Sequence, residues 1–116
     1  MHEISLATGI LERVEEAARR EGFSSVRELR LEVGRLSGVE IEALRFALES
    51  MAPGTLLAGA CIRLDERPGS AWCAQCAALV EVSSRIEPCP QCGGFGLQLR
   101  AGTELRLVDL LVCDTA

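Results

Sequence analysis

Two short cysteine segments decide the fold: Cys73-Ala74-Gln75-Cys76 and, after twelve intervening residues, Cys89-Pro90-Gln91-Cys92. A CxxC turn points two thiolates at one cation, and two such turns complete a tetrahedron. Four thiolates leave no open coordination position, so the site is structural and not catalytic. We therefore predict one structural zinc ion on these cysteines and no catalytic residues.

Other uses of paired cysteines fit less well. Disulfides need an oxidising compartment, and no basic segment followed by an apolar stretch opens the chain as in a secretory signal. The sequence therefore predicts a cytoplasmic protein. A redox CxxC of the thioredoxin type would occur singly. An iron–sulfur cluster uses four cysteines too and stays open as the alternative metal centre.

The cysteine segments lie in a stretch too short to build its own core without a staple. Zinc binding contributes on the order of 10–16 kcal/mol in small zinc peptides, enough to hold such a stretch together. We expect a zinc-ribbon domain over 68–99, and a body made of 1–67 plus 100–116.

The body is expected to be α+β. Apolar residues at three- and four-residue steps predict helices over about 5–20 and 41–51, the second preceded by a capping-box pattern. Alternation predicts strands over 26–33, 60–66 and 105–112, with the last, apart from Arg106 and Asp109, apolar enough for burial on both faces. The fold class is two helices packed on a three-stranded sheet, with the zinc ribbon inserted between strands two and three. The capping box would pair Ser37 with Glu40.

The composition of the chain excludes some classes of binding partner. The formal net charge is −5 and aromatic residues make up 3% of the chain. A nucleic-acid binder is usually basic, because phosphate neutralisation supplies affinity, and single-strand binders stack bases on aromatic rings. We therefore expect no nucleic-acid partner. The apolar runs are too short to span a membrane.

Cys61 and Cys113 lie outside the ribbon, in the second and third expected strands. We expect them to be small buried hydrophobes. If those two strands pair, the two thiols would be neighbours and open to oxidation.

The amino terminus offers a second set of metal donors. His2 is the only histidine and directly follows Met1, and such a bulky second residue normally protects the initiator methionine from removal. The α-amine and the imidazole can both be neutral donors near pH 7, and the amides of His2 and Glu3 lie at chelate-ring distances. Planar nitrogen donors favour Ni(II) or Cu(II). The alternative is an exposed histidine without a ligand, and a Glu3 that only favours a helix N-terminus.

Several motifs in this order resemble one family. They are Met1-His2-Glu3, the run from Gly34 to Glu40, Pro53-Gly54-Thr55, the paired CxxC segments, and Gly102-Thr103-Glu104-Leu105. Over essentially its whole length the chain resembles the HypA/HybF family, nickel-insertion accessory proteins in the maturation of nickel–iron hydrogenase.

The resemblance implies a nickel metallochaperone. Ni(II) would bind at Met1, His2 and Glu3, and zinc at Cys73, Cys76, Cys89 and Cys92. The implied partners are the HypB GTPase and the hydrogenase large subunit. A protruding ribbon leaves room for strand exchange and hence for a homo-oligomer. The rival hypotheses are a zinc-ribbon module of nucleic-acid or transcription complexes, and a redox switch that releases zinc.

Overall fold

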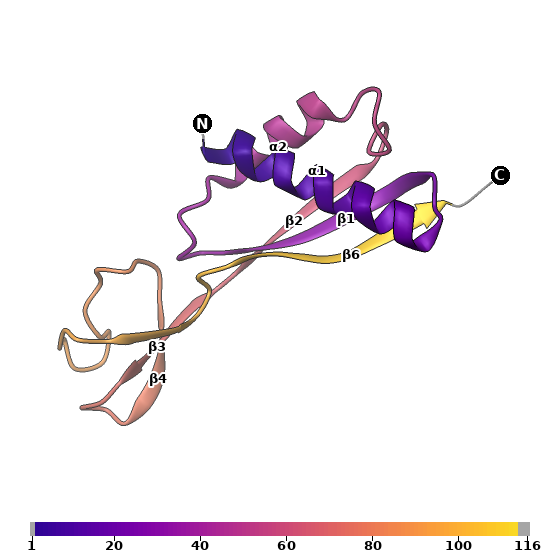
Figure 1. Cartoon of the computed structure of the whole chain (residues 1–116). Coiled ribbons are helices and arrows are strands. Elements are labelled where there is room, and N and C mark those ends of the chain that lie inside the picture. The colour runs from indigo at the N-terminus through magenta and orange to yellow at the C-terminus, as the bar shows by residue number, and fades with distance from the viewer. Residues whose placement is uncertain (1, 114–116) are drawn as a thin grey trace. The chain divides into compact units, whose positions relative to one another are not determined.

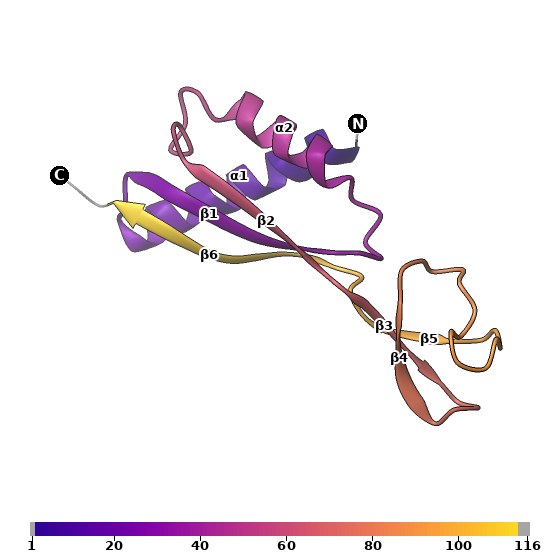
Figure 2. The same ribbon diagram turned by 180° about the vertical axis from the view of Figure 1, so that it is seen from behind.

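The computed structural model describes residues 2–113. Its elements, drawn in Figures 1 and 2, form two three-stranded sheets with the strand orders β2-β1-β6 and β4-β3-β5. The expected α+β fold is confirmed, with the second sheet inserted between β2 and β6. The bounds are α1 (His2–Glu21), β1 (Ser25–Gly34), α2 (Ile41–Met51), β2 (Cys61–Arg67), β3 (Gly69–Cys73), β4 (Ala78–Val82), β5 (Gln98–Ala101) and β6 (Leu105–Cys113).

The contacts within the chain define two compact units. Unit 1 comprises Met1–Leu31, Glu40–Asp65 and Leu107–Ala116, and unit 2 comprises Glu32–Val39 and Glu66–Arg106. The connector after β1 therefore groups with the cysteine-rich part. The domain boundaries expected from the sequence stay a prediction, because compactness does not establish which part folds by itself.

Unit 1 is a two-layer arrangement. Both helices lie on one face of the sheet and pack against each other (Figure 1). The apolar stripe of each helix faces the sheet and is matched by buried side chains of β1. The opposite sheet face is wet and carries cross-strand ion pairs such as Arg30–Asp109 at 2.6 Å. The buried residues of this core include Ala7, Ile10, Val14, Leu29, Leu31, Leu44 and Leu48.

The expected capping box does not form. Gly38 has a φ of +80°, which turns the chain before a helix can begin. The Ser37 hydroxyl instead accepts the Val39 N–H at 3.2 Å, and the N-cap of α2 is Glu40, which makes no side-chain cap. The helix therefore begins at Ile41.

The expectation for the last strand was also wrong. No residue of β6 is buried, because β6 is an edge strand and helices cover only one face of the sheet. Cys61 is exposed and Cys113 half-buried, so neither is the buried hydrophobe that we expected. The strands that carry them do not pair, since β1 lies between them. Strands two apart are separated by about 10 Å, beyond the Cα reach of a disulfide.

Candidate metal sites

Backbone hydrogen bonds shape both cysteine segments. The hairpin of β3 and β4 pairs Cys73 with Ala78, and a positive φ of 53° at Ala77 closes the turn between them. In the second segment the N–H of Gly93 donates to the carbonyl of Cys89, and the N–H of Cys89 donates to the carbonyl of Gly94, both at 2.8 Å. Each turn thus presents two sulfur atoms on one side.

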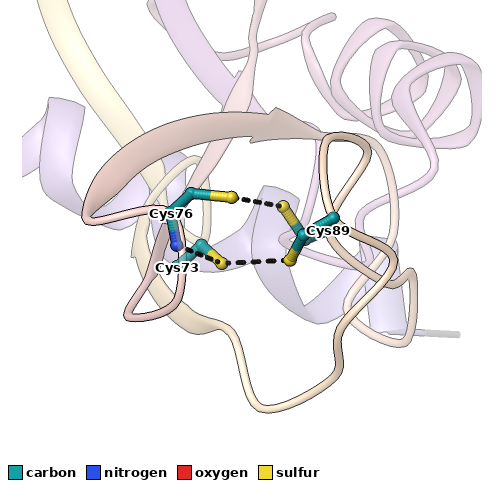
Figure 3. Close-up of side chains that lie close together, drawn as sticks. Cys73, Cys76 and Cys89 are labelled. Carbon is teal, nitrogen blue, oxygen red and sulfur yellow. Dashed lines mark hydrogen bonds between the residues drawn. The ribbon is translucent and has the colours of Figure 1, made fainter.

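The four sulfur atoms form a compact cluster. They lie within 4.8 Å of one another, with Sγ–Sγ distances of 3.7 Å between Cys73 and Cys92 and 3.9 Å between Cys76 and Cys89. Figure 3 shows Cys73, Cys76 and Cys89 facing a common centre. A tetrahedral zinc ion with Zn–S bonds of about 2.3 Å requires sulfur atoms about 3.8 Å apart. The donor set therefore fits a structural zinc ion.

Backbone N–H groups point at the sulfurs of Cys73 and Cys89. The Cys76 N–H lies 3.5 Å from Sγ of Cys73, and the Gln91 N–H lies 3.4 Å from Sγ of Cys89. The N–H groups of Cys92 and Gln91 lower the pKa of the Cys89 thiol to about 7, whereas the hydrogen bond with Cys92 raises the pKa of the Cys76 thiol to about 12. Such backbone donors stabilise the charged ligand that zinc needs.

The core of unit 2 is small and includes two of the cysteines. Leu36 joins it from the connector after β1, and the Arg85 guanidinium donates to the Leu36 carbonyl at 2.8 Å. Sequence reasoning missed this role, because a lone leucine in a connector carries no periodic signal. The buried members are Leu36, Ala71, Cys73, Val80, Val82 and Cys89.

The amino-terminal donors lie at the start of α1. His2 is its first residue and is exposed. The carboxylate of Glu3 accepts the N–H of Glu40 at 3.0 Å, which ties the start of α1 to the start of α2. This hydrogen bond is the main cause that lowers the pKa of Glu3. The third expected nickel ligand, Met1, lies outside the described residues. The helix begins three residues earlier than the apolar stripe predicted.

The first turn of a helix suits a nitrogen-donor site. Its N–H groups have no acceptor within the helix, so the amide nitrogens of His2 and Glu3 are not committed to the helical ladder. Among the described residues, Cys73, Cys76, Cys89 and Cys92 are the only cluster of three or more His, Cys, Asp or Glu side chains close enough to share an ion. A second metal at the chain end would therefore need amine and amide nitrogens beside the imidazole.

Known proteins resemble the chain over nearly its full length. Residues 1–112 match the family described as hydrogenase/urease nickel incorporation, metallochaperone, hypA. The hydrogenase maturation factor HypA of Cupriavidus necator is 60% identical over 98% of this chain and 96% of its own. That of Polaromonas naphthalenivorans is 55% identical over 98% and 99%. A nucleic-acid or transcription module is not favoured by these matches.

Solved structures share the fold. The solution structure of the nickel metallochaperone HypA from Helicobacter pylori superposes with a TM-score of 0.67, at 18% identity over 95% of this chain and 96% of that one. A second solution structure of a HypA protein has a TM-score of 0.71 at 18% identity, over 99% and 98%. Within residues 2–113, neither helix is both long and apolar enough to cross a membrane.

Proposed function

Because this chain belongs to the HypA family of nickel metallochaperones for hydrogenase maturation, we propose that its amino terminus is the nickel carrier. Ni(II) binds to four nitrogens: the α-amine of Met1, the imidazole and amide of His2, and the amide of Glu3. Zinc is held by Cys73, Cys76, Cys89 and Cys92 and gives unit 2 its shape.

The exposure of His2 at the first turn of α1 is the observation that carries this proposal. An imidazole there is open to solvent, and the amides beside it lack helical acceptors. The Glu3 carboxylate is already engaged with Glu40. We therefore assign Glu3 two separate roles, an amide donor to nickel and a side-chain tether between the helices.

The position of the nickel donors at an exposed chain end suits the transfer of nickel to another protein. An acceptor protein can replace the nitrogens one at a time at an exposed chain end without unfolding a core. Amine, imidazole and amide donors must lose protons to bind, so nickel affinity decreases as the pH falls. Copper(II) binds the same donors more tightly, so selectivity depends on metal supply and on partner recognition.

The protein acts as a carrier and not as an enzyme, and it works in the cytoplasm. Its partners in the maturation machinery are the HypB GTPase and the hydrogenase large subunit. A carrier needs a protein that accepts its metal, and the family to which the chain belongs supports a partner within the maturation machinery.

Blocking the α-amine should abolish stoichiometric nickel binding. The chain contains no lysine, so acetylation with an N-hydroxysuccinimide ester at neutral pH modifies one amine, that of Met1. Calorimetry with Ni(II) should show affinity reduced by at least about a hundredfold, since an acetylated nitrogen is no longer a donor. His2→Ala should have an effect of the same size.

Glu3→Ala is the matched control. It removes the carboxylate but keeps the backbone amide, so it should weaken nickel binding far less than His2→Ala does. The zinc content of all three proteins should stay at one ion per chain. Unchanged nickel binding in both the acetylated protein and His2→Ala would refute the terminal site.

A further inference from the structure

An apolar groove lies between the first turn of α1 and the outer side of α2, entirely within unit 1. It has a volume of about 310 Å³, and its lining includes Ile4, Ala43, Phe46 and Met51, with Glu3 as the charged residue. The Phe46 side chain is 72% exposed and that of Ile4 is 59% exposed. Two large apolar side chains from different helices thus line one open depression.

Phe46 is on the wrong side of α2 for a core residue. The core side of the helix carries Leu44, Ala47 and Leu48, which are buried, and a surface helix normally keeps its large apolar residues there. An exposed ring beside a second exposed apolar side chain is typical of an interaction site. The exposed side chains of Ile4 and Phe46 therefore indicate that the groove is a binding site.

The surroundings of the ring are acidic. Glu42 and Glu49 lie four residues before and three after Phe46, on the same side of α2, and both are exposed. Arg45, the only cation of the helix, donates to the Ile62 carbonyl of β2 at 2.7 Å and also lies 3.7 Å from the carboxylate of Glu42, whose side chain stays 80% exposed. The outer side of α2 therefore presents carboxylates around an apolar centre.

This acidity holds for unit 1 as a whole. Unit 2 contains five arginines and five glutamates, which cancel, so the formal net charge of −5 resides in unit 1. A second copy of the chain would place the same carboxylates opposite each other in a two-fold interface, which is repulsive. The charge instead matches a cationic occupant.

We propose that this groove binds a basic amphipathic helix of a partner protein. One apolar side chain of that helix packs between Ile4 and Phe46, and lysine or arginine side chains on its flanks pair with Glu42 and Glu49. A helix satisfies its own backbone hydrogen bonds and needs no free sheet edge. Because Glu3 lines the groove, the partner docks beside the proposed nickel donors, although docking itself does not require nickel.

A model peptide tests the groove. The probe is a fluorescein-labelled 18-residue peptide of leucine and lysine, with the leucines at helical spacing, titrated with the full-length zinc-loaded protein at low ionic strength. Fluorescence anisotropy should show saturable binding that weakens at least about tenfold in Phe46→Ser, the size expected for a central aromatic anchor. Glu49→Lys should weaken it about threefold, and a peptide with glutamate in place of lysine should not bind.

Phe95→Ser is the matched control, because Phe95 is 81% exposed and lies in unit 2. It should bind the peptide as the parent does. Equal binding by Phe46→Ser, an equal loss in Phe95→Ser, or equal binding of the glutamate peptide would overturn the proposal. So would a dimer in sedimentation that Phe46→Ser dissociates, since the occupant would then be a second copy.

The groove and the nickel site can fail separately. Phe46→Ser should bind nickel like the parent, and protein acetylated at its α-amine should still bind the lysine peptide. If acetylated protein keeps its nickel but Phe46→Ser loses the peptide, the terminal nickel site is wrong and the groove is right. If acetylated protein loses its nickel while Phe46→Ser still binds the peptide, the terminal nickel site is right and the groove is wrong.

Discussion

Cys89→Ser should unfold unit 2 and leave the helices of unit 1 in place. Cys89 is 2% exposed and is both a proposed zinc ligand and part of the core of unit 2. Zinc binding is worth on the order of 10–16 kcal/mol in small zinc peptides, comparable to the whole stability of a typical domain, about 5–15 kcal/mol. The remaining apolar core, mainly Leu36, Val80 and Val82, is too small to replace it.

Three measurements check this result. Zinc content should fall from one ion per chain to none. The single tryptophan, Trp72, lies in β3 of unit 2, so its emission should shift to that of a water-exposed indole. The far-ultraviolet circular dichroism should keep its helical signal, because α1 and α2 both belong to unit 1.

Cys61→Ser is the control for the loss of a thiol. Cys61 is exposed on β2 and lies outside the cluster of four sulfurs. This variant should retain zinc and native Trp72 emission, and a chelator added to the parent should reproduce Cys89→Ser. Retained zinc together with native Trp72 emission in Cys89→Ser would show that the four-thiolate assignment is wrong.

The zinc cluster could be predicted from the sequence because each half of it is local. A CxxC turn fixes two sulfurs within a few residues, and the structure brings the two turns together with all four sulfurs within 4.8 Å of one another. Leu36 was not predictable in the same way. Its place in the core of unit 2 depends on a contact with residues more than thirty positions away in the chain, and no local pattern encodes it.

The two wrong expectations have different physical causes. The Ser37–Glu40 pattern predicted a capping box, but the φ of +80° at Gly38 determined where the chain turns. The apolar run of β6 predicted burial, but two helices cover only one face of the sheet, and Leu111 remains 56% exposed. Local patterns state which side chains prefer burial. Which of these side chains are buried depends on the number and placement of the elements that cover the sheet.

Gly102→Ala should destabilise unit 2 by about 2–5 kcal/mol. The φ of Gly102 is +86°, which costs other residues about 1–2 kcal/mol. A Cβ there would lie 2.6 Å from the Cα of Gly69 and 2.6 Å from the carbonyl oxygen of Pro68. Overpacking of this kind costs about 1–3 kcal/mol more. Gly34→Ala should have a similar effect, because its Cβ would collide with the backbone of Gly102.

Gly34 and Gly102 lie where backbone segments of unit 2 pass close to each other and are joined by hydrogen bonds. The backbone carbonyl of Gly102 accepts the N–H of Leu36 at 2.7 Å. The N–H of Gly34 donates to the backbone carbonyl of Glu104, and the N–H of Arg35 donates to the backbone carbonyl of Arg67, both at 2.8 Å. A side chain that forces the segments apart also pulls Leu36 out of the core next to the zinc ligands. The variant should therefore lose zinc to a competing chelator faster than the parent does.

Gly9→Ala separates this steric effect from the general effect of replacing glycine. Gly9 lies inside α1, and an added Cβ would meet nothing within 4 Å. Alanine there should stabilise unit 1 by about 0.5–1 kcal/mol. Urea unfolding resolves the two effects, with Trp72 emission reporting unit 2 and helical circular dichroism reporting unit 1. If Gly102→Ala leaves the Trp72 transition where it is in the parent, the close backbone crossing does not exist, and Leu36 must be held in the core by its side chain alone.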